Sequence, residues 1–272
     1  MIGVAASAAL TDVLTGPPVG AVVRGAGRLA CYLDVGRSIL VIETADGAGL
    51  PNAVQMGPDA TPLQAARGDA VTIGHGELCG AGWHAVVRRW WNPNVAVGPV
   101  DAHALTAAAR HLGDPGETVQ RLTLAVRVAD RAEILAASRS LVGRGPGLTP
   151  AGDDVLAGLL ATLRVLGPAL DEPAAAHADA VADALARAVV DYAVTHTPAL
   201  SAQLLSFANR SAVARPVAGV LRAIAGDGNL ARACLALSRL GHTSGRDLLR
   251  GIAVAVDAML WVSQSAPELV ED

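Results

Sequence analysis

The chain has 272 residues, of which 52% are hydrophobic but only 3% aromatic, and a formal net charge of −4. This length allows one large or two small domains with a substantial core, built here from Ala, Leu and Val. The acidic balance excludes a broad cationic surface for nucleic acid or for a membrane, and the absence of lysine among the 21 basic residues excludes P-loop, Schiff-base and pyridoxal-phosphate chemistry.

The first hundred residues have the pattern of short strands. Runs rich in β-branched residues, such as RLACYLDV (28–35), SILVIET (38–44) and AVTIGHG (70–76), are separated by Gly, Pro and Asp-Gly turns. We therefore predict an antiparallel β-rich sheet or small barrel over residues 1–100.

Cysteine and histidine usage in this chain is sparse. The three cysteines, Cys31, Cys79 and Cys234, are too few and too scattered for a disulfide framework, which favours a reduced, cytoplasmic location. His75, Cys79 and His84 have only a loosely metal-like spacing in a glycine-rich strand region, so we assign no metal site to them.

After a junction at RRWWNPNVAVGPVD (88–101), apolar residues recur at helical spacing. We predict an α-helical domain over residues 101–272, and thus an α+β protein of two domains. The expected helices cover residues 104–112, 119–141, 155–166, 177–194, 200–208, 217–225, 230–240 and 248–262.

The helical part is interrupted by a glycine-rich segment, GRGPGLTPAGDD (143–154). Its Thr149-Pro150 pair predicts an N-cap followed by proline at the first position of a helix. One interpretation is a tight turn followed by close helix packing at Gly158. The other is that main-chain N–H groups approach an anion at the positive end of the helix, through the glycines Gly145, Gly147 and Gly152.

A second stretch, GHTSGRDLLRG (241–251), aligns with GLTPAGDDVLAG (147–158) with one gap. Glycine, threonine and aspartate recur in both, so Thr149 aligns with Thr243 and Asp154 with Asp247. Compositional bias is one explanation. The other is that two glycine-opened helix starts face a single ligand.

Asp153 and Asp154 follow the first glycine-rich loop directly. Two carboxylates repel an anion unless Mg²⁺ intervenes or one of them satisfies the helix N-terminus, so Mg²⁺ is the one cofactor left open. Successive residues of a helix point about 100° apart. We expect one carboxylate to face the site and the other to fix the loop, and we favour Asp154 as the functional one because of its match with Asp247.

A third polar segment, THTPALSAQLL (195–205), places His196, Thr197 and Ser201 at the start of another predicted helix. Taken alone it is more typical of a Ser/Thr helix cap than of a catalytic site. We expect His196 to border the same site as the two glycine-rich helix starts.

Together the three motifs resemble a bacterial family that includes the AllH-type subunit of oxamate carbamoyltransferase, over residues 140–262. The resemblance implies carbamoyl transfer between oxamate or oxalurate and phosphate in ureide (allantoin) catabolism, within a complex of partner subunits. It also implies a principal site formed by Gly145, Gly147, Thr149, Gly152, Asp153 and Asp154. A facing loop would be formed by His242, Thr243, Ser244 and Gly245.

This chemistry requires donors for phosphate, carbamoyl phosphate or an oxamate-like anion, which helix N-termini supply without lysine. We expect Arg144 to pair with a substrate carboxylate, Thr197 and Ser201 to contact substrate, and His242 or His196 to transfer protons. Two alternatives are a Mg-nucleotide phosphotransferase and a non-catalytic ligand-binding or scaffolding subunit.

Overall fold

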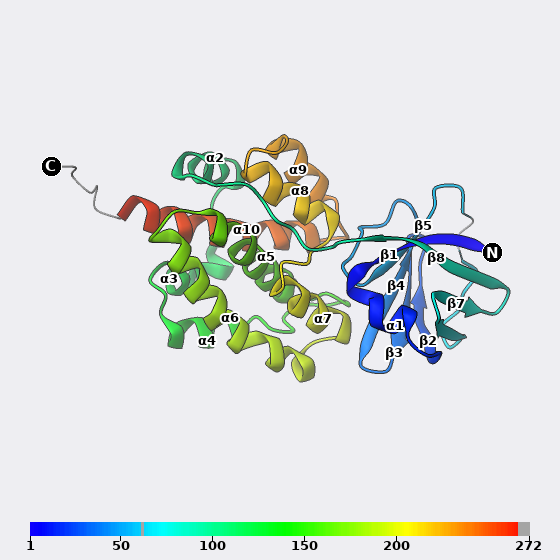
Figure 1. The fold of residues 1–272 in the computed structure, drawn as a ribbon. Helices are drawn as coiled ribbons and strands as arrows, with labels where there is room; N and C mark the ends of the chain where they lie inside the picture. Colours follow the sequence, from blue (N-terminus) through cyan, green and yellow to red (C-terminus); the bar gives the residue numbers. More distant parts are fainter. Residues whose placement is uncertain (61–62, 266–272) are drawn as a thin grey trace. The chain divides into compact units, whose positions relative to one another are not determined.

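The structure is a computed structural model that describes residues 1–60 and 63–265. The chain divides into two units, Met1–Pro93 and Asn94–Asp272 (Figure 1). The first unit is built of strands and the second of helices, so the predicted α+β class is confirmed.

The first unit is a closed barrel with the strand order β1-β5-β4-β3-β2-β6-β7-β8. Six neighbouring pairs are antiparallel, whereas β1–β8 and β4–β5 are parallel. Turn signals mark hairpins between consecutive strands, but the β1–β8 pairing that closes the barrel has no local signal. The strands are β1 (Ile2–Ser7), β2 (Val19–Ala26), β3 (Ala30–Val35), β4 (Ser38–Glu43), β5 (Ala53–Met56), β6 (Ala70–Gly74), β7 (Glu77–Gly80) and β8 (Trp83–Trp91).

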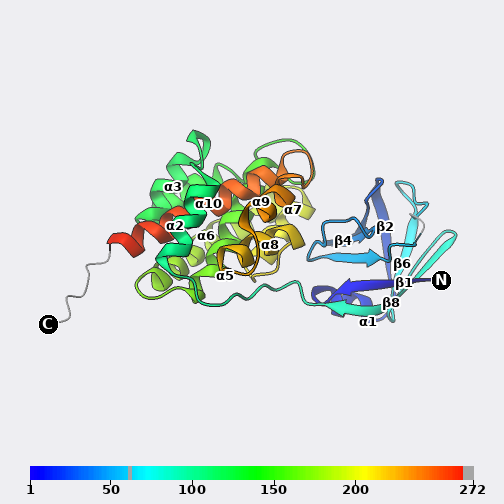
Figure 2. The same ribbon diagram turned by 90° about the horizontal axis from the view of Figure 1, so that it is seen from above.

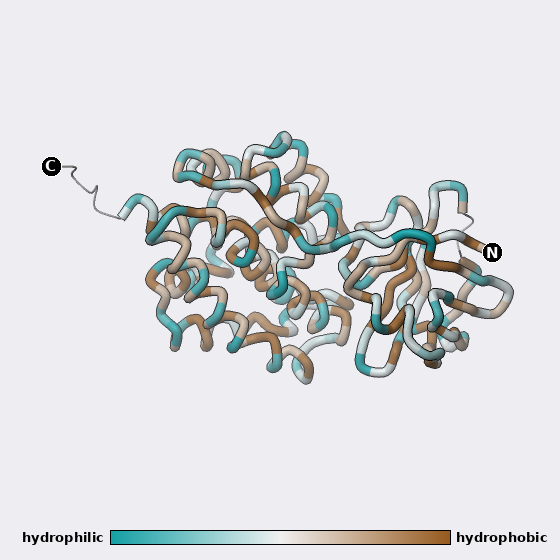
Figure 3. The backbone as a smooth tube through the Cα atoms, viewed as in Figure 1, coloured by the Kyte–Doolittle hydropathy of each residue, from teal (hydrophilic) through white to brown (hydrophobic). Residues whose placement is uncertain are grey.

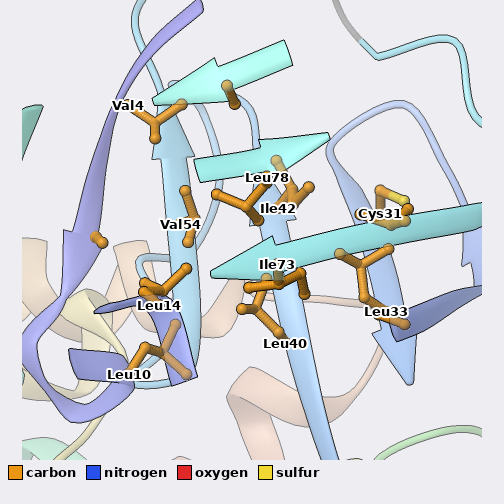
Figure 4. Close-up of a cluster of buried hydrophobic side chains, with 14 of the residues drawn as sticks. Val4, Leu10, Leu14, Cys31, Leu33, Leu40, Ile42, Val54, Ile73 and Leu78 are labelled. Atoms are coloured by element: carbon orange, nitrogen blue, oxygen red, sulfur yellow. The ribbon is translucent and has the colours of Figure 1, made fainter. Parts of the chain in front are cut away.

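Aliphatic side chains fill the barrel (Figure 4). Leu33, Ile73 and Leu78 are fully buried, and each contributes about 1.5–3 kcal/mol relative to an exposed position. Leu10 and Leu14 join this core from the turn η1 (Ala8–Leu10) and the short helix α1 (Thr11–Thr15). In Figure 3 the barrel strands are largely brown, the colour of apolar residues, and several connecting loops are teal.

The regular elements in the described part of the second unit are helices. Its elements are α2 (Ala102–Leu112), η2 (Glu117–Val119), α3 (Gln120–Arg127), α4 (Arg131–Arg139), α5 (Ala151–Leu166), η3 (Gly167–Ala169), α6 (Ala174–His196), α7 (Ala199–Ala208), α8 (Arg215–Ile224), α9 (Leu230–Ser238) and α10 (Ser244–Ser265). Within the described residues, no helix combines the length and the apolar character that crossing a membrane requires.

The predicted continuous helix at 119–141 is wrong, because the chain breaks it into η2, α3 and α4. Ala129 has a positive φ of 52°, which an α-helix does not allow. Asp130 then caps α4 by accepting hydrogen bonds from the N–H groups of Ala132 and Glu133. Asp130 was the sequence signal for this boundary, because aspartate is favoured at the N-cap position.

Helices α5 and α10 pack against each other in the centre of the helical unit (Figures 1 and 2). They touch through their backbones at two glycines. A Cβ atom at Gly158 would collide with the carbonyl oxygen of Leu248, and one at Gly251 would collide with that of Val155. The packing interpretation of Gly158 is thereby confirmed.

Candidate functional site

The first and second motifs meet at the N-terminal ends of α5 and α10. The hydroxyl of Thr149 lies 3.0 Å from that of Ser244, although the two residues are 95 positions apart. The predicted N-cap is wrong by one residue: Pro150 occupies the cap position, and no side chain caps the helix there. Thr149 instead joins the two helix starts.

The third motif reaches the same place through Asp153. This carboxylate is 1% exposed and accepts hydrogen bonds from the N–H of Gly143 (2.9 Å), from the hydroxyl of Ser201 (2.7 Å) and from the hydroxyl of Thr197. Hydrogen bonds to a charged group contribute about 1.5–3 kcal/mol each. Asp153 therefore fixes the glycine-rich loop against the start of α7.

A short sequence repeat places two of these residues at equivalent positions of their helices. Thr197-Pro198-Ala199 repeats Thr149-Pro150-Ala151, and the two prolines share one conformation, with φ and ψ of −57° and 145° against −55° and 144°. A helix begins directly after each proline, so Asp153 and Ser201 both occupy the third helical position. The Thr-Pro-Ala triplet is the sequence signal of this repeat, and none of the predictions above used it.

The longer internal alignment corresponds to a structural repeat of the loops that lead into α5 and α10. The N–H of Gly152 donates to the carbonyl of Arg144, and that of Gly245 donates to the carbonyl of Leu240, both at 3.0 Å. A Cβ atom at either glycine would collide with a backbone carbonyl, that of Leu141 or Leu237 respectively. Both glycines are therefore required by close backbone contact.

Asp154 lies in surroundings different from those of Asp153. It is 6% exposed, and its Oδ2 atom is buried with no hydrogen-bond partner among the described residues. The pKa of Asp154 is raised to about 7, and burial is the largest cause. The charges of Asp247 and Asp153 also raise this pKa, whereas hydrogen bonds from Ser244 and Thr149 lower it. Near neutral pH this carboxyl group can therefore both give and take a proton.

Asp247 is the aligned partner of Asp154 and is equally withdrawn from solvent, at 3% exposed. Its carboxylate pairs with the guanidinium of Arg250, three residues later on α10. Asp247 therefore has a cationic partner, whereas no described residue forms an ion pair with Asp154.

The glycine-rich loop is exposed and has unused donors. Gly145 and Gly147 have positive φ angles of 122° and 97°. No described residue accepts a hydrogen bond from the N–H groups of Gly145, Gly147 or Thr149. The N–H of Gly152 is already bonded to Arg144, so the donors left for an anion are those earlier in the loop.

The remaining predicted site residues lie at the exposed edge of this cluster. Arg144, His242 and Thr243 are exposed, and Ser244 is half-buried. His196 is also exposed; its ring stacks on Tyr192 at 3.6 Å, and its Nδ1 atom lies 2.8 Å from the Tyr192 carbonyl. Among the described contacts, no hydrogen bond joins either histidine to Asp154.

Residues 141–256, which contain all three motifs, match the family model of a transferase subunit. That family is described as oxamate carbamoyltransferase subunit AllH. The resemblance drawn from the motifs to the AllH-type family is thereby confirmed. No solved structure matches the chain.

Proposed function

We propose that the chain is a subunit of, or a relative of, a carbamoyltransferase that acts on oxamate or oxalurate and phosphate, and that its site lies at the starts of α5, α7 and α10. The observation that carries the proposal is the Asp154 carboxyl, which is buried, has an unpartnered oxygen and a pKa of about 7. Such a group suits general acid–base catalysis at neutral pH.

The reaction requires one proton to change position. A phosphate oxygen attacks the carbamoyl carbon of oxalurate, forming a C–O bond, and the C–N bond to oxamate then breaks. The oxamate nitrogen gains a proton, and the phosphate hydroxyl loses one. Protonated Asp154 gives its proton to the leaving nitrogen and regains one from phosphate, and the reverse reaction uses the same steps in the opposite order.

The loop supplies the binding groups in this proposal. The N–H groups of Gly145 and Gly147 bind phosphate and the oxyanion of the tetrahedral intermediate, since they have no other acceptor among the described residues. The exposed Arg144 pairs with the substrate carboxylate. His242 and His196 are the further candidates for proton exchange with solvent, and Thr243 and Ser244 for substrate contact.

Asp153 has a positioning role here, because Gly143, Thr197 and Ser201 already donate to its carboxylate. The aspartate pair therefore does not favour a Mg-nucleotide site. The name of the matched family describes a subunit. We accordingly propose that the chain works with partner subunits, in the cytoplasm, on a small anionic substrate.

Ligand-induced thermal shifts test the binding part of the proposal. Phosphate, carbamoyl phosphate, oxamate and Mg·ATP are added in turn to the full chain, and a ligand of the native state raises its unfolding temperature by mass action. We expect shifts with phosphate or carbamoyl phosphate. A shift with Mg·ATP alone would favour the phosphotransferase alternative.

Transferase assays with the partner subunits test the catalytic part. Asp154→Asn should reduce carbamoyl transfer by about 100-fold or more, the usual contribution of a general acid, and should keep the anion-induced shift. Asp227→Asn, which changes an exposed aspartate between α8 and α9, is the matched control. Full activity of the partner subunits alone would overturn the proposal in favour of a scaffolding role.

A further inference from the structure

The barrel carries a second cluster of chemically active side chains, on the hairpin of β7 and β8. Cys79 pairs directly with His84, and Leu78 pairs with Ala85. Leu78 and Ala85 are buried in the barrel core, and Leu78 is seen among the core side chains in Figure 4. Because side chains alternate along a strand, Glu77, Cys79 and His84 project from the opposite, outer face.

These three side chains converge on one point. Their donor atoms, a carboxylate oxygen of Glu77, Sγ of Cys79 and a ring nitrogen of His84, all lie within 4.8 Å of one another. The Nε2 atom of His84 is already 3.0 Å from Oε2 of Glu77. The sequence had grouped His75, not Glu77, with Cys79 and His84. His75 lies in the turn before β7, with a φ of 53°, and Glu77 takes its place in the group.

We propose that Glu77, Cys79 and His84 form a binding site for a divalent transition-metal ion of the zinc class. Tetrahedral zinc with its usual bond lengths requires donor atoms about 3.3–3.8 Å apart. The donor atoms, which lie within 4.8 Å of one another, would have to approach by about 1–1.5 Å at most, through rotation of side chains whose backbones the strand pairing holds in register. Half-exposed side chains of Glu77 and His84 leave the site open to an ion from solvent.

The donor set determines which ion fits. A thiolate and an imidazole favour Zn²⁺ or Co²⁺ over the hard ions Mg²⁺ and Ca²⁺, which prefer oxygen ligands alone. Three protein ligands leave the fourth tetrahedral position to a water molecule, as in zinc sites that are open to substrate. The site belongs to the barrel and is independent of the carbamoyltransferase proposal.

Metal titration of the reduced full-length chain tests the proposal. We expect one equivalent of Zn²⁺ to bind, and Co²⁺ to give the near-ultraviolet charge-transfer band of a cobalt–thiolate bond. Zn²⁺, but not Mg²⁺, should protect Cys79 from alkylation, read by mass spectrometry of its peptide. This last measurement uses the unaltered protein, so it remains informative if a variant fails to fold.

Variants then assign the ligands. Cys79→Ser and His84→Ala should each weaken Zn²⁺ binding by more than about tenfold, because each removes one of three protein ligands. Cys234→Ser, which changes a buried cysteine of the helical unit, should leave binding unchanged. Alkylation of Cys79 at the same rate with and without Zn²⁺, or unaltered Zn²⁺ affinity in both ligand variants, would overturn the proposal.

Discussion

Replacing Asp154 by asparagine should stabilise the helical unit at alkaline pH while abolishing the proposed proton transfer. The carboxyl is 6% exposed and has an unpartnered oxygen, so its ionised form is poorly solvated in the folded chain. An amide of the same shape has no charge to bury. The stability gain should therefore depend on pH.

The sign and size follow from the two pKa values. The ordinary value of 3.8 describes the unfolded chain, and about 7 describes the folded one. Between these pH values the folded chain holds a proton that the unfolded chain has lost. The stability that Asp154 contributes by remaining protonated is therefore fully present below pH 4, and it is lost as the pH rises through 7. A shift of about three pKa units corresponds to about 4 kcal/mol at 1.36 kcal/mol per unit.

Urea unfolding between pH 4 and pH 8.5, followed by the helical circular dichroism signal, measures this difference. The free energy of unfolding of Asp154→Asn minus that of the wild type should increase by about 4 kcal/mol over this range. A constant contribution of the new amide cancels in that increase. Asp227→Asn should show no such trend, since it changes an exposed aspartate.

A pH-independent difference between Asp154→Asn and the wild type would refute the reasoning, because it would mean that Asp154 titrates alike in the folded and unfolded chains. Infrared spectroscopy provides a second measurement on the folded protein. The band of a protonated carboxylic acid should be present at pH 6, and should be missing in the variant.

The neighbouring residue should behave in the opposite way: Asp153→Asn should lower the free energy of unfolding by about 3 kcal/mol, because three donors lose a charged acceptor, and an unchanged urea midpoint would contradict this. Gly251→Ala should lower the free energy of unfolding by about 3 kcal/mol or more, because the methyl group forces α10 away from α5. Gly219→Ala should stabilise α8 by about 0.5–1 kcal/mol, because nothing lies within 4 Å of the new methyl group. Calorimetry should show shifts of the unfolding temperature of opposite sign for the two variants. Leu33→Ala should destabilise the barrel by about 2–5 kcal/mol, because it empties a fully buried position, and retention of the wild-type unfolding temperature would exclude this.

The sequence predicted the fold class because strand and helix patterns are local. The alternating residues of β3 and the apolar repeat of α5 each lie within one short segment of sequence, and each of the prolines before α5 and α7 directly precedes its helix. The pairing of β1 with β8 was out of reach, because it joins segments about 80 residues apart, and nothing in either segment specifies the other.

The candidate site was predictable to a similar degree. The aspartate pair, the aligned glycines and the angle between neighbouring helical residues predicted that one carboxylate faces the site and the other fixes the loop. The donors to Asp153 could not be assigned, since Thr197 and Ser201 approach it only when α7 packs beside α5. The ion pair of Asp247 with Arg250 depends on the orientation of an arginine side chain, which spacing alone does not determine.

The glycine crossing of α5 and α10 sets the spacing between the two aligned carboxyl groups. Asp154 precedes Gly158 by four residues, and Asp247 precedes Gly251 by four, so on each helix the acidic side chain lies one turn before the contact and on the same face. Because the two backbones are in direct contact, the distance between the two carboxyl groups is fixed, and so is the repulsion between them. A bulkier residue at Gly251 should therefore move the carboxyl groups apart, and the pKa of Asp154 should fall together with the stability of the unit.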